Sequence, residues 1–146
     1  MAEYSSNDVS LKGKDTDVFN KLSDPSALKS FLNNVPLEQI PEDKRAVLDK
    51  IRLSDDRVVI SGGPAGDMTL KVSGKKEPSY VRYDGIGLPV KLALVFKISP
   101  VDNMSSRCSV TIDADIPAML RPMIGGTLQK AADQFAMMLA SIPAWD

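Results

Sequence analysis

The stretch that decides the fold is the last one, DIPAMLRPMIGGTLQKAADQFAMMLASI, which runs from Asp115 to Ile142. Its large apolar residues recur in steps of three and four, a spacing that places them on one side of an α-helix. The alanines between them favour helix formation. A helix from Ala118 to Ile142 would be roughly 37 Å long at 1.5 Å per residue, long enough to cross a small domain. Its apolar stripe needs a partner along that whole length.

The segments before this helix are short. Residues 7–12 alternate between polar and apolar and predict a first strand. Two short helices are expected next: Asp15 would cap the first, and Asp24 would cap the second, with Pro25 in its opening turn. Pro41 predicts the start of a further short helix, either a single turn or one that reaches Asp49.

From Ile51 onward the chain alternates at period two, with turn-forming residues between the alternating segments. The expected strands are 51–53, 57–61, 67–72, 79–84, 90–98 and 107–116. Consecutive hairpins predict one antiparallel sheet with a polar outer face and an apolar face that needs a cover. The C-terminal helix supplies this cover, so we expect a single α+β domain over residues 1–146.

Composition excludes several classes of function. Lysine and arginine number 18 against 19 acids, so no basic field exists to attract nucleic acid. No run approaches the 18 or so apolar residues of a membrane span, and the first residues do not resemble a signal peptide. The single cysteine, Cys108, allows no internal disulfide and fits a reducing compartment. We therefore expect no nucleic-acid partner, no stable membrane insertion and a cytoplasmic location.

The chain contains no histidine, the usual general base near neutral pH and the commonest metal ligand. With one cysteine as well, the sequence predicts no metal site and no cofactor. Asp113 and Asp115 lie two apart on a predicted strand and are the remaining candidates for acid–base catalysis. Ser109 and Thr111 share their side, which is typical of a solvated face. No catalytic residue is assigned, and enzymatic activity stays open.

Glycine and proline mark the connections. Gly62 to Gly66 predicts a hairpin loop, since the lysine and helix of a phosphate-binding loop do not follow. Gly85 to Pro89 predicts a bulge or loop, either a lid or a plain connection. Pro122 and the pair Gly125–Gly126 indicate a gate in the helix or, as we favour, a late helix start with a close approach to the sheet.

Five other side chains have expected positions. Tyr80 and Tyr83 point to opposite faces of one strand, and we expect Tyr83 to face inward. Arg82 predicts an exposed cross-strand charge. Cys108 predicts a small buried strand residue and not a nucleophile. Trp145 is expected to anchor the chain end.

This order of elements resembles the helix-grip fold of the START/Bet v 1-like superfamily, often named SRPBCC. The segment DVFNKLSDPSAL, from Asp17 to Leu28, is similar to the first-helix pattern of that superfamily. The segment DADIPAMLRPMI, from Asp113 to Ile124, is similar to its passage from last strand to long helix. The resemblance covers essentially the whole chain. It is greatest to a small bacterial branch that includes polyketide cyclase-like proteins and proteins like the G-type component of carbon monoxide dehydrogenase.

The resemblance implies a bent antiparallel sheet of six to seven strands around a long C-terminal helix, with two short helices after the first strand and an apolar cavity inside. It implies no catalytic motif. The cavity is also favoured by seven methionines, which suit adaptable surfaces, while a densely filled core is the alternative. The residues expected to bind a ligand are Met68, Leu70, Val72, Val81, Tyr83, Leu92, Leu94, Phe96, Val110, Ile112, Met119, Leu120, Met123 and Ile124.

The main hypothesis is a non-catalytic carrier or sensor whose partner is a small hydrophobic molecule, lipid or isoprenoid-like. The first alternative is a protein-interaction or assembly factor with a filled core, which would use Val59, Ala93 and Val95 on the outer strand face. The second is a cyclase-like or hydrolase-like enzyme. The sequence leaves all three open.

Overall fold

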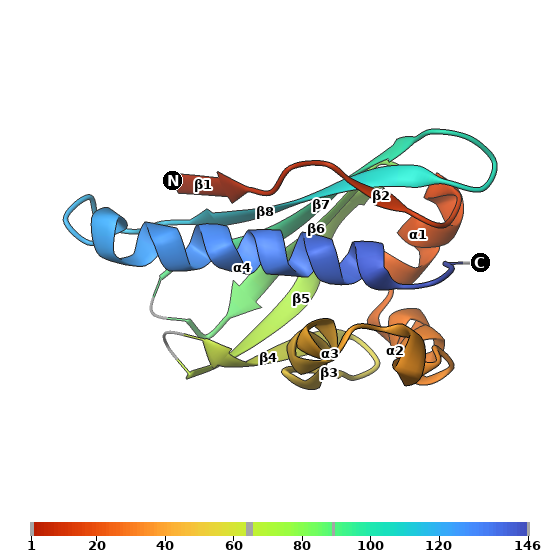
Figure 1. Cartoon of the computed structure of the whole chain (residues 1–146). Helices are drawn as coiled ribbons and strands as arrows, with labels where there is room; N and C mark the ends of the chain where they lie inside the picture. Colours follow the sequence, from red (N-terminus) through yellow and green to blue (C-terminus); the bar gives the residue numbers. More distant parts are fainter. Residues whose placement is uncertain (1, 64–65, 89, 146) are drawn as a thin grey trace.

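In the computed structural model, which describes residues 2–63, 66–88 and 90–145, one long helix crosses one face of an antiparallel sheet (Figure 1). The strands are β1 (Ala2–Ser5), β2 (Val9–Leu11), β3 (Ile51–Leu53), β4 (Arg57–Gly63), β5 (Gly66–Lys76), β6 (Tyr80–Ile86), β7 (Leu92–Pro100) and β8 (Ser106–Ala114). The helices are α1 (Asp15–Leu22), α2 (Pro25–Asn33), a 3₁₀ turn (Leu37–Gln39), α3 (Glu42–Asp49) and α4 (Arg121–Ser141). The predicted α+β helix-grip class is confirmed.

The strand order is β1-β8-β7-β6-β5-β4-β3, and β2 also pairs with β8. The hairpins expected from β3 to β8 are all antiparallel neighbours. Gly63 pairs with Gly66 across the predicted glycine hairpin, whose Pro64 and Ala65 lie outside the described residues. Strand β1 was not predicted: Tyr4, opposite Ile112, is its only large apolar residue, too little for an alternation signal.

Two other connections differ in detail from the expectation. The turn expected after Val72 is part of β5, which continues to Lys76 through an irregularity between Val72 and Gly74. Strand β6 extends to Ile86, into the expected Gly85 to Pro89 loop. Gly87 then adopts a positive φ of 68°, which favours glycine. Pro89 lies outside the described residues.

The three short helices begin close to their predicted positions. Asp24 caps α2, since its carboxylate accepts a hydrogen bond from the Ser26 backbone N–H at 3.0 Å, and Pro25 follows in the first turn. Asp15, however, is the first residue of α1 and not its cap. Its carboxylate accepts from the backbone N–H of the next residue at 2.9 Å. Helix α3 reaches Asp49, the longer of the two expected lengths.

Helix α4 begins later than predicted, at Arg121, after a turn formed by residues 118–120. Pro122 therefore lies in the first turn, where its missing N–H costs no helical hydrogen bond. A Cβ atom on Gly125 would lie 2.9 Å from the Tyr4 hydroxyl oxygen. The late start is thus confirmed. The close approach to the sheet is confirmed at Gly125 but not at Gly126, which faces open space.

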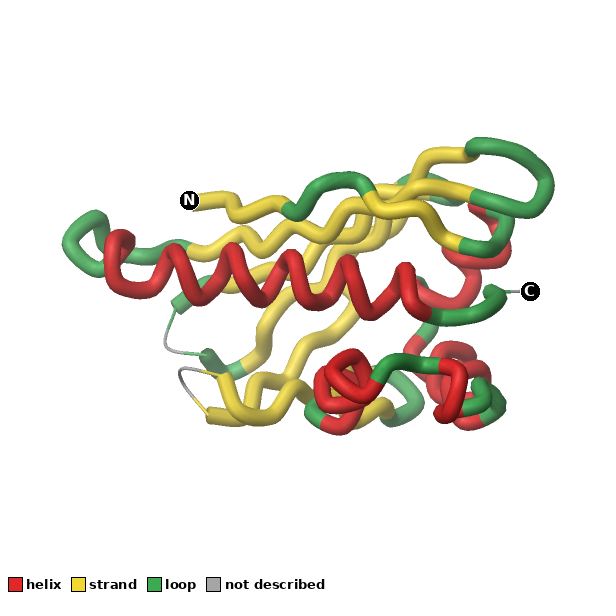
Figure 2. The backbone as a smooth tube through the Cα atoms, in the orientation of Figure 1, coloured by secondary structure: helices red, strands yellow, loops and turns green. Residues whose placement is uncertain are grey.

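One side of α4 carries small residues and packs closely on the sheet. Gly125, Ala132 and Ala136 are buried. The helix contacts β8, β1 and β2, and Figure 2 shows it running alongside the strands at this edge of the sheet. The Gln129 side chain lies between them and donates to the Ser5 carbonyl oxygen at 2.8 Å. The larger residues, including Leu128, occupy another side of the helix.

Trp145 anchors the chain end, as expected. The side chain is fully buried, and its ring stacks on Phe31 with centroids 5.1 Å apart. Its indole N–H donates to the Leu139 carbonyl oxygen at 3.4 Å, and its backbone N–H donates to the Lys12 carbonyl oxygen at 2.9 Å. The Lys21 ammonium donates to the Trp145 carbonyl oxygen.

The outer face of the sheet differs from the sequence-based expectation. Ala93 and Val95, expected as exposed docking positions, are 0% and 5% exposed, and each lies between paired residues of β6 and β8 within the sheet. Val59 is partly buried. Arg82 bonds along its own strand and not across strands, with its Nε 3.1 Å from the Asp84 carboxylate. The surface expected for the assembly alternative is therefore not available.

The burial of Trp145 predicts the effect of removing it. Trp145→Ala should lower the free energy of unfolding by roughly 3–5 kcal/mol, since it deletes a large buried ring. Trp145→Phe, the matched control, keeps a stacked ring and should lose about 1 kcal/mol through the missing N–H hydrogen bond. Urea titration followed by circular dichroism measures both. Equal stability of Trp145→Ala and the wild type would contradict an anchoring role.

Cys108, expected as a buried strand residue, is fully buried on β8, and this burial raises the pKa of its thiol from 9.0 to about 12, helped by the charge of Asp8. The folded chain therefore keeps the thiol proton at alkaline pH values where the unfolded chain loses it. This contribution to stability is complete below pH 9.0 and is lost as the pH rises towards about 12.

Two measurements follow for Cys108. Iodoacetamide at neutral pH should label the thiol in urea but not in the native protein, because only the exposed thiolate reacts. Cys108→Ala should reduce the alkaline loss of stability measured by urea unfolding. Rapid labelling of the native protein, at a rate independent of its stability, would show that the thiol is accessible.

Candidate functional site

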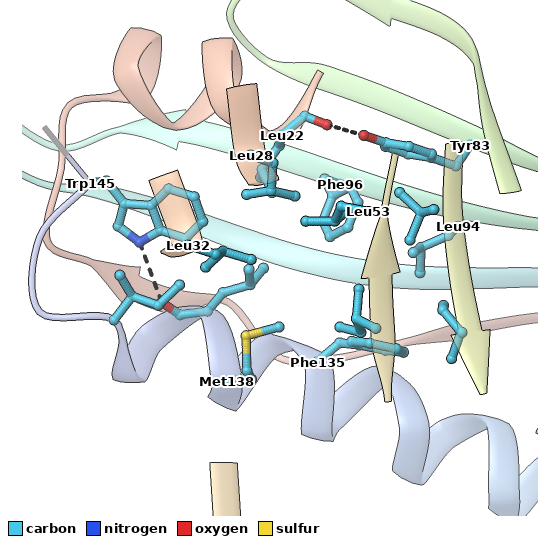
Figure 3. A pocket seen from close by; sticks show the side chains of 15 residues that line it. Leu22, Leu28, Leu32, Leu53, Tyr83, Leu94, Phe96, Phe135, Met138 and Trp145 are labelled. Atoms are coloured by element: carbon cyan, nitrogen blue, oxygen red, sulfur yellow. Dashed lines mark hydrogen bonds between the residues drawn. The ribbon is translucent and has the colours of Figure 1, made fainter. Parts of the chain in front are cut away.

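Three adjoining hollows lie between the large apolar residues of α4 and the sheet, and we name them the inner, middle and outer chambers. The inner chamber, about 50 Å³, lies near the end of α4 (Figure 3). Leu28 and Leu32 of α2 and Met138 of α4 meet there with Trp145 and with Tyr83 of β6. All of its lining side chains are apolar or aromatic, and they nearly fill it.

The middle chamber is the largest, at about 300 Å³. Leu70, Leu92 and Ile112 line it from the sheet, and Leu128 and Ala131 line it from α4. It also holds all the charged side chains of the three linings, which are described below. This chamber lies beside the central turns of α4, opposite residues of β4, β5, β7 and β8.

The outer chamber, about 240 Å³, lies beside the beginning of α4. Leu88 and Val90 line it from the connection between β6 and β7, and Ile116, Leu120 and Ile124 line it from the passage into α4. Its lining is entirely apolar. Leu120 is 41% exposed and Val90 is 41% exposed, so apolar surface continues from this chamber to solvent.

Shared side chains join the chambers. Leu94 and Phe135 line both the inner and the middle chamber. Met68, Leu92 and Leu128 line both the middle and the outer chamber. The three hollows therefore follow one another along α4 as a single groove, and we use "the groove" for all three.

A polar rim borders the middle chamber. We use this name for Lys50, Ser61, Thr127, Lys130 and Gln134. The three α4 residues recur in steps of three and four, so they form one stripe beside Leu128 and Ala131. The other two meet at the sheet edge, where the Ser61 backbone N–H donates to the Lys50 carbonyl oxygen at 2.8 Å.

The chamber linings include most of the residues predicted for the site. Those that line at least one chamber are Met68, Leu70, Tyr83, Leu92, Leu94, Phe96, Ile112, Leu120 and Ile124. Val81 and Val110 are fully buried in the core, and Val72 packs against it, without lining a chamber.

Two predicted residues lie away from the groove. Met119 is 89% exposed and Met123 is 77% exposed. Met119 precedes the start of α4. Met123 lies in the first turn of α4, five residues before Leu128 and therefore about 140° away from it around the helix, on the exposed side. The methionine of α4 that does line a chamber is Met138.

Sequence reasoning missed the polar rim and the second half of the helix. Phe135 and Leu128 belong to the apolar stripe, yet the methionines drew the predicted site toward the helix start. The usable signal for the three rim residues of α4 is their helical spacing directly beside the apolar stripe.

Tyr83 faces inward, as expected. Its hydroxyl donates to the Leu22 carbonyl oxygen at 2.5 Å (Figure 3), and burial, with the charge of Asp24, raises its pKa above the ordinary value. The phenol is thus a neutral donor whose partner is already in place. Asp113 and Asp115 line no chamber: Asp113 lies next to Ile112 on β8 and so points to the opposite face.

Within residues 2–63, 66–88 and 90–145, no three side chains of the His, Cys, Asp or Glu type gather as metal ligands would. In the same part of the chain, no helix has both the length and the apolar character that a bilayer crossing requires.

No protein-family model matches this sequence, and no curated protein sequence does. Solved structures match in shape. A norcoclaurine synthase from Thalictrum flavum, in complex with dopamine and hydroxybenzaldehyde, aligns with a TM-score of 0.63 over 95% of this chain and 85% of its own, at 10% identity. A START superfamily protein from Mycobacterium smegmatis aligns with a TM-score of 0.55 over 94% and 96% of the two chains, at 13% identity. A conserved protein from Geobacillus kaustophilus gives 0.54 over 94% and 93%, at 19% identity.

Identities this low carry information about fold alone. The alignments span nearly the whole of each chain, including the sheet and α4. They agree with the element order and with the resemblance found in the sequence. This chain therefore has the helix-grip fold of the SRPBCC/START/Bet v 1-like superfamily.

Proposed function

We propose that this protein is a non-catalytic carrier or sensor that holds a small hydrophobic molecule in the groove beside α4. The observation that carries the proposal is the middle chamber of about 300 Å³ with an adjoining outer chamber of about 240 Å³. The middle chamber alone reaches the lower end of the range of about 300–1,000 Å³ that is typical of ligand pockets. A lining of leucine, isoleucine and methionine favours apolar ligands.

The shape of the groove favours an elongated ligand. The outer chamber is lined by α4 positions up to Leu128, the middle chamber by positions from Thr127 to Phe135, and the inner chamber from Phe135 onward. A lipid-like or isoprenoid-like chain fits this succession of chambers better than a compact ring system does. Each methylene moved from water into such a lining contributes about 0.8 kcal/mol.

The solved structures give limited support. The norcoclaurine synthase of similar fold was determined with two small organic molecules, so ligand binding is within the range of this fold. At 10% identity its chemistry is not carried over to this chain. The single, buried Cys108 suits a reducing compartment, and we place the protein in the cytoplasm.

Filling the middle chamber tests the proposal. Ala131→Phe puts a ring into this chamber and should weaken binding of a neutral fluorescent probe such as phenylnaphthylamine by roughly tenfold or more, since several buried methylene contacts are lost. The free energy of unfolding of the wild type should rise by roughly 2.7 kcal/mol when the free probe concentration is about 100 times its Kd. Fluorescence titration and thermal unfolding measure the two effects.

The matched control is Ala46→Phe, an exposed position on α3 that lines no chamber. It should bind the probe like the wild type. If folded wild-type protein binds no apolar probe up to its solubility limit, or if both variants bind equally well, the groove is not a ligand site.

Phe135 separates the middle from the inner chamber and predicts a change in ligand length. Phe135→Ala should join these chambers and shift the preferred fatty acid to a longer chain, because the tail gains room toward Trp145. The variant should lose roughly 2–4 kcal/mol of stability through the deleted ring. Titrating a series from octanoic to hexadecanoic acid measures the preference. An unchanged optimum in a folded variant would show that ligands do not reach this end.

A further inference from the structure

Polarity is distributed unevenly along the groove. The outer chamber has an entirely apolar lining. The inner chamber has one hydroxyl, that of Tyr83, which already donates to a carbonyl oxygen. Within the described part of the chain, charged side chains, and polar side chains without a hydrogen bond to the protein, border only the middle chamber. A bound molecule therefore meets polar groups at one point along its length.

The charge at that point has one sign. Lys50, which follows α3, and Lys130 of α4 bring two ammonium groups to the same rim from two elements that pack together. Within the described part of the chain, no carboxylate lines the middle chamber and neither lysine forms an ion pair. Asp133, close in sequence, instead accepts from Gln129 at 3.2 Å, on the side of α4 that faces β1.

Neutral donors accompany the two lysines. Ser61, Thr127 and Gln134 border the same chamber, and in the described part of the chain their side chains make no hydrogen bond to the protein. Hydroxyl and amide groups can donate to oxygen atoms, and an ammonium group donates up to about three hydrogen bonds. The polar rim therefore offers hydrogen-bond donors and positive charge together. A carboxylate or phosphate group accepts hydrogen bonds from such donors and is attracted by the charge.

We propose that the ligand is a single-chain amphiphile with an anionic head group. This inference rests on the proposed function of the groove. The head group lies at the polar rim between Lys50 and Lys130. The hydrocarbon chain enters the middle chamber and continues past Met68 and Leu128 into the outer chamber, because both residues line both chambers. The inner chamber, at about 50 Å³, has no room for it as long as the Phe135 ring is present. Carboxylates and phosphate monoesters share the chemistry that this rim recognises.

The experiment compares head groups on one hydrocarbon chain. Dodecanoate, dodecyl phosphate and dodecanol are titrated by displacement of the neutral probe phenylnaphthylamine from the wild type, Lys50→Met and Lys130→Met. Each substitution should lower the affinity for the two anions, relative to the affinity for dodecanol, by roughly two- to fivefold, the range expected for an exposed ion pair. The double variant should lose roughly tenfold. The preference should also fall at high salt, where the screening length drops to about 3 Å at 1 M.

Charge reversal sharpens the test. Lys130→Glu should weaken both anions further and improve binding of dodecylamine. Lys97→Met, an exposed lysine on β7 that lines no chamber, is the matched control and should leave every affinity unchanged. A loss of affinity in the lysine variants for dodecanoate, for dodecyl phosphate or for both supports the proposal. It also identifies which head group the lysines bind.

Failure of this inference is distinguishable from failure of the proposed function. If the neutral probe and dodecanol bind but the lysine variants leave the ratio of anion to alcohol affinity unchanged, the groove holds ligands without reading a charge, and the inference is wrong. If neither the probe nor any amphiphile binds folded protein, the proposed function itself is wrong.

Discussion

The close contact between the small side of α4 and the strands β1, β2 and β8 is the constraint on which the rest of the structure depends. Gly125 leaves no space for a side chain against Tyr4, and Ala132 and Ala136 are fully buried. A helix is about 10–12 Å across with its side chains. Strands are spaced about 4.8 Å apart, so one helix covers roughly two or three of them. An eight-stranded sheet gripped at one edge by α4 must leave its other strands to be covered by something else.

The elements other than α4 cover the sheet unequally along the length of the helix. Near the end of α4, Leu28 and Leu32 of α2 and the Trp145 ring reach the inner chamber and reduce it to about 50 Å³. Beside the central and first turns, no comparable element of the described chain lies over the strands, and the middle and outer chambers stay open. The groove thus follows from where the short helices end. Its filled end coincides with the anchor of the chain terminus, which explains why one end of the groove is closely packed and the other is lined by exposed side chains such as Leu120.

The sequence predicted the architecture well because the architecture rests on periodicity. The steps of three and four in the last stretch and the alternation from Ile51 onward are local signals, and the structure contains both. The position of the site depended on a finer reading of the helix. Met119 lies before the start of α4 at Arg121, and Met123 lies about 140° around the helix from Leu128, so both methionines are exposed. The polar rim was only partly predictable: Lys50 and Lys130 border the same chamber through the packing of α3 on α4, which no spacing encodes.

The polar rim also lowers the energetic cost of a groove of this volume. A sealed apolar cavity of about 300 Å³ would cost about 7 kcal/mol at the roughly 24 cal/mol per Å³ measured for core cavities. Such a cost is comparable with the whole stability of a domain, about 5–15 kcal/mol. A chamber bordered by Thr127, Ser61 and Gln134 admits water that these groups can hydrogen-bond, so the unliganded fold avoids most of that penalty. Neutral side chains suffice for this purpose. The two lysines add positive charge that is not needed to hold water in the chamber. A ligand with a negative charge would neutralise it.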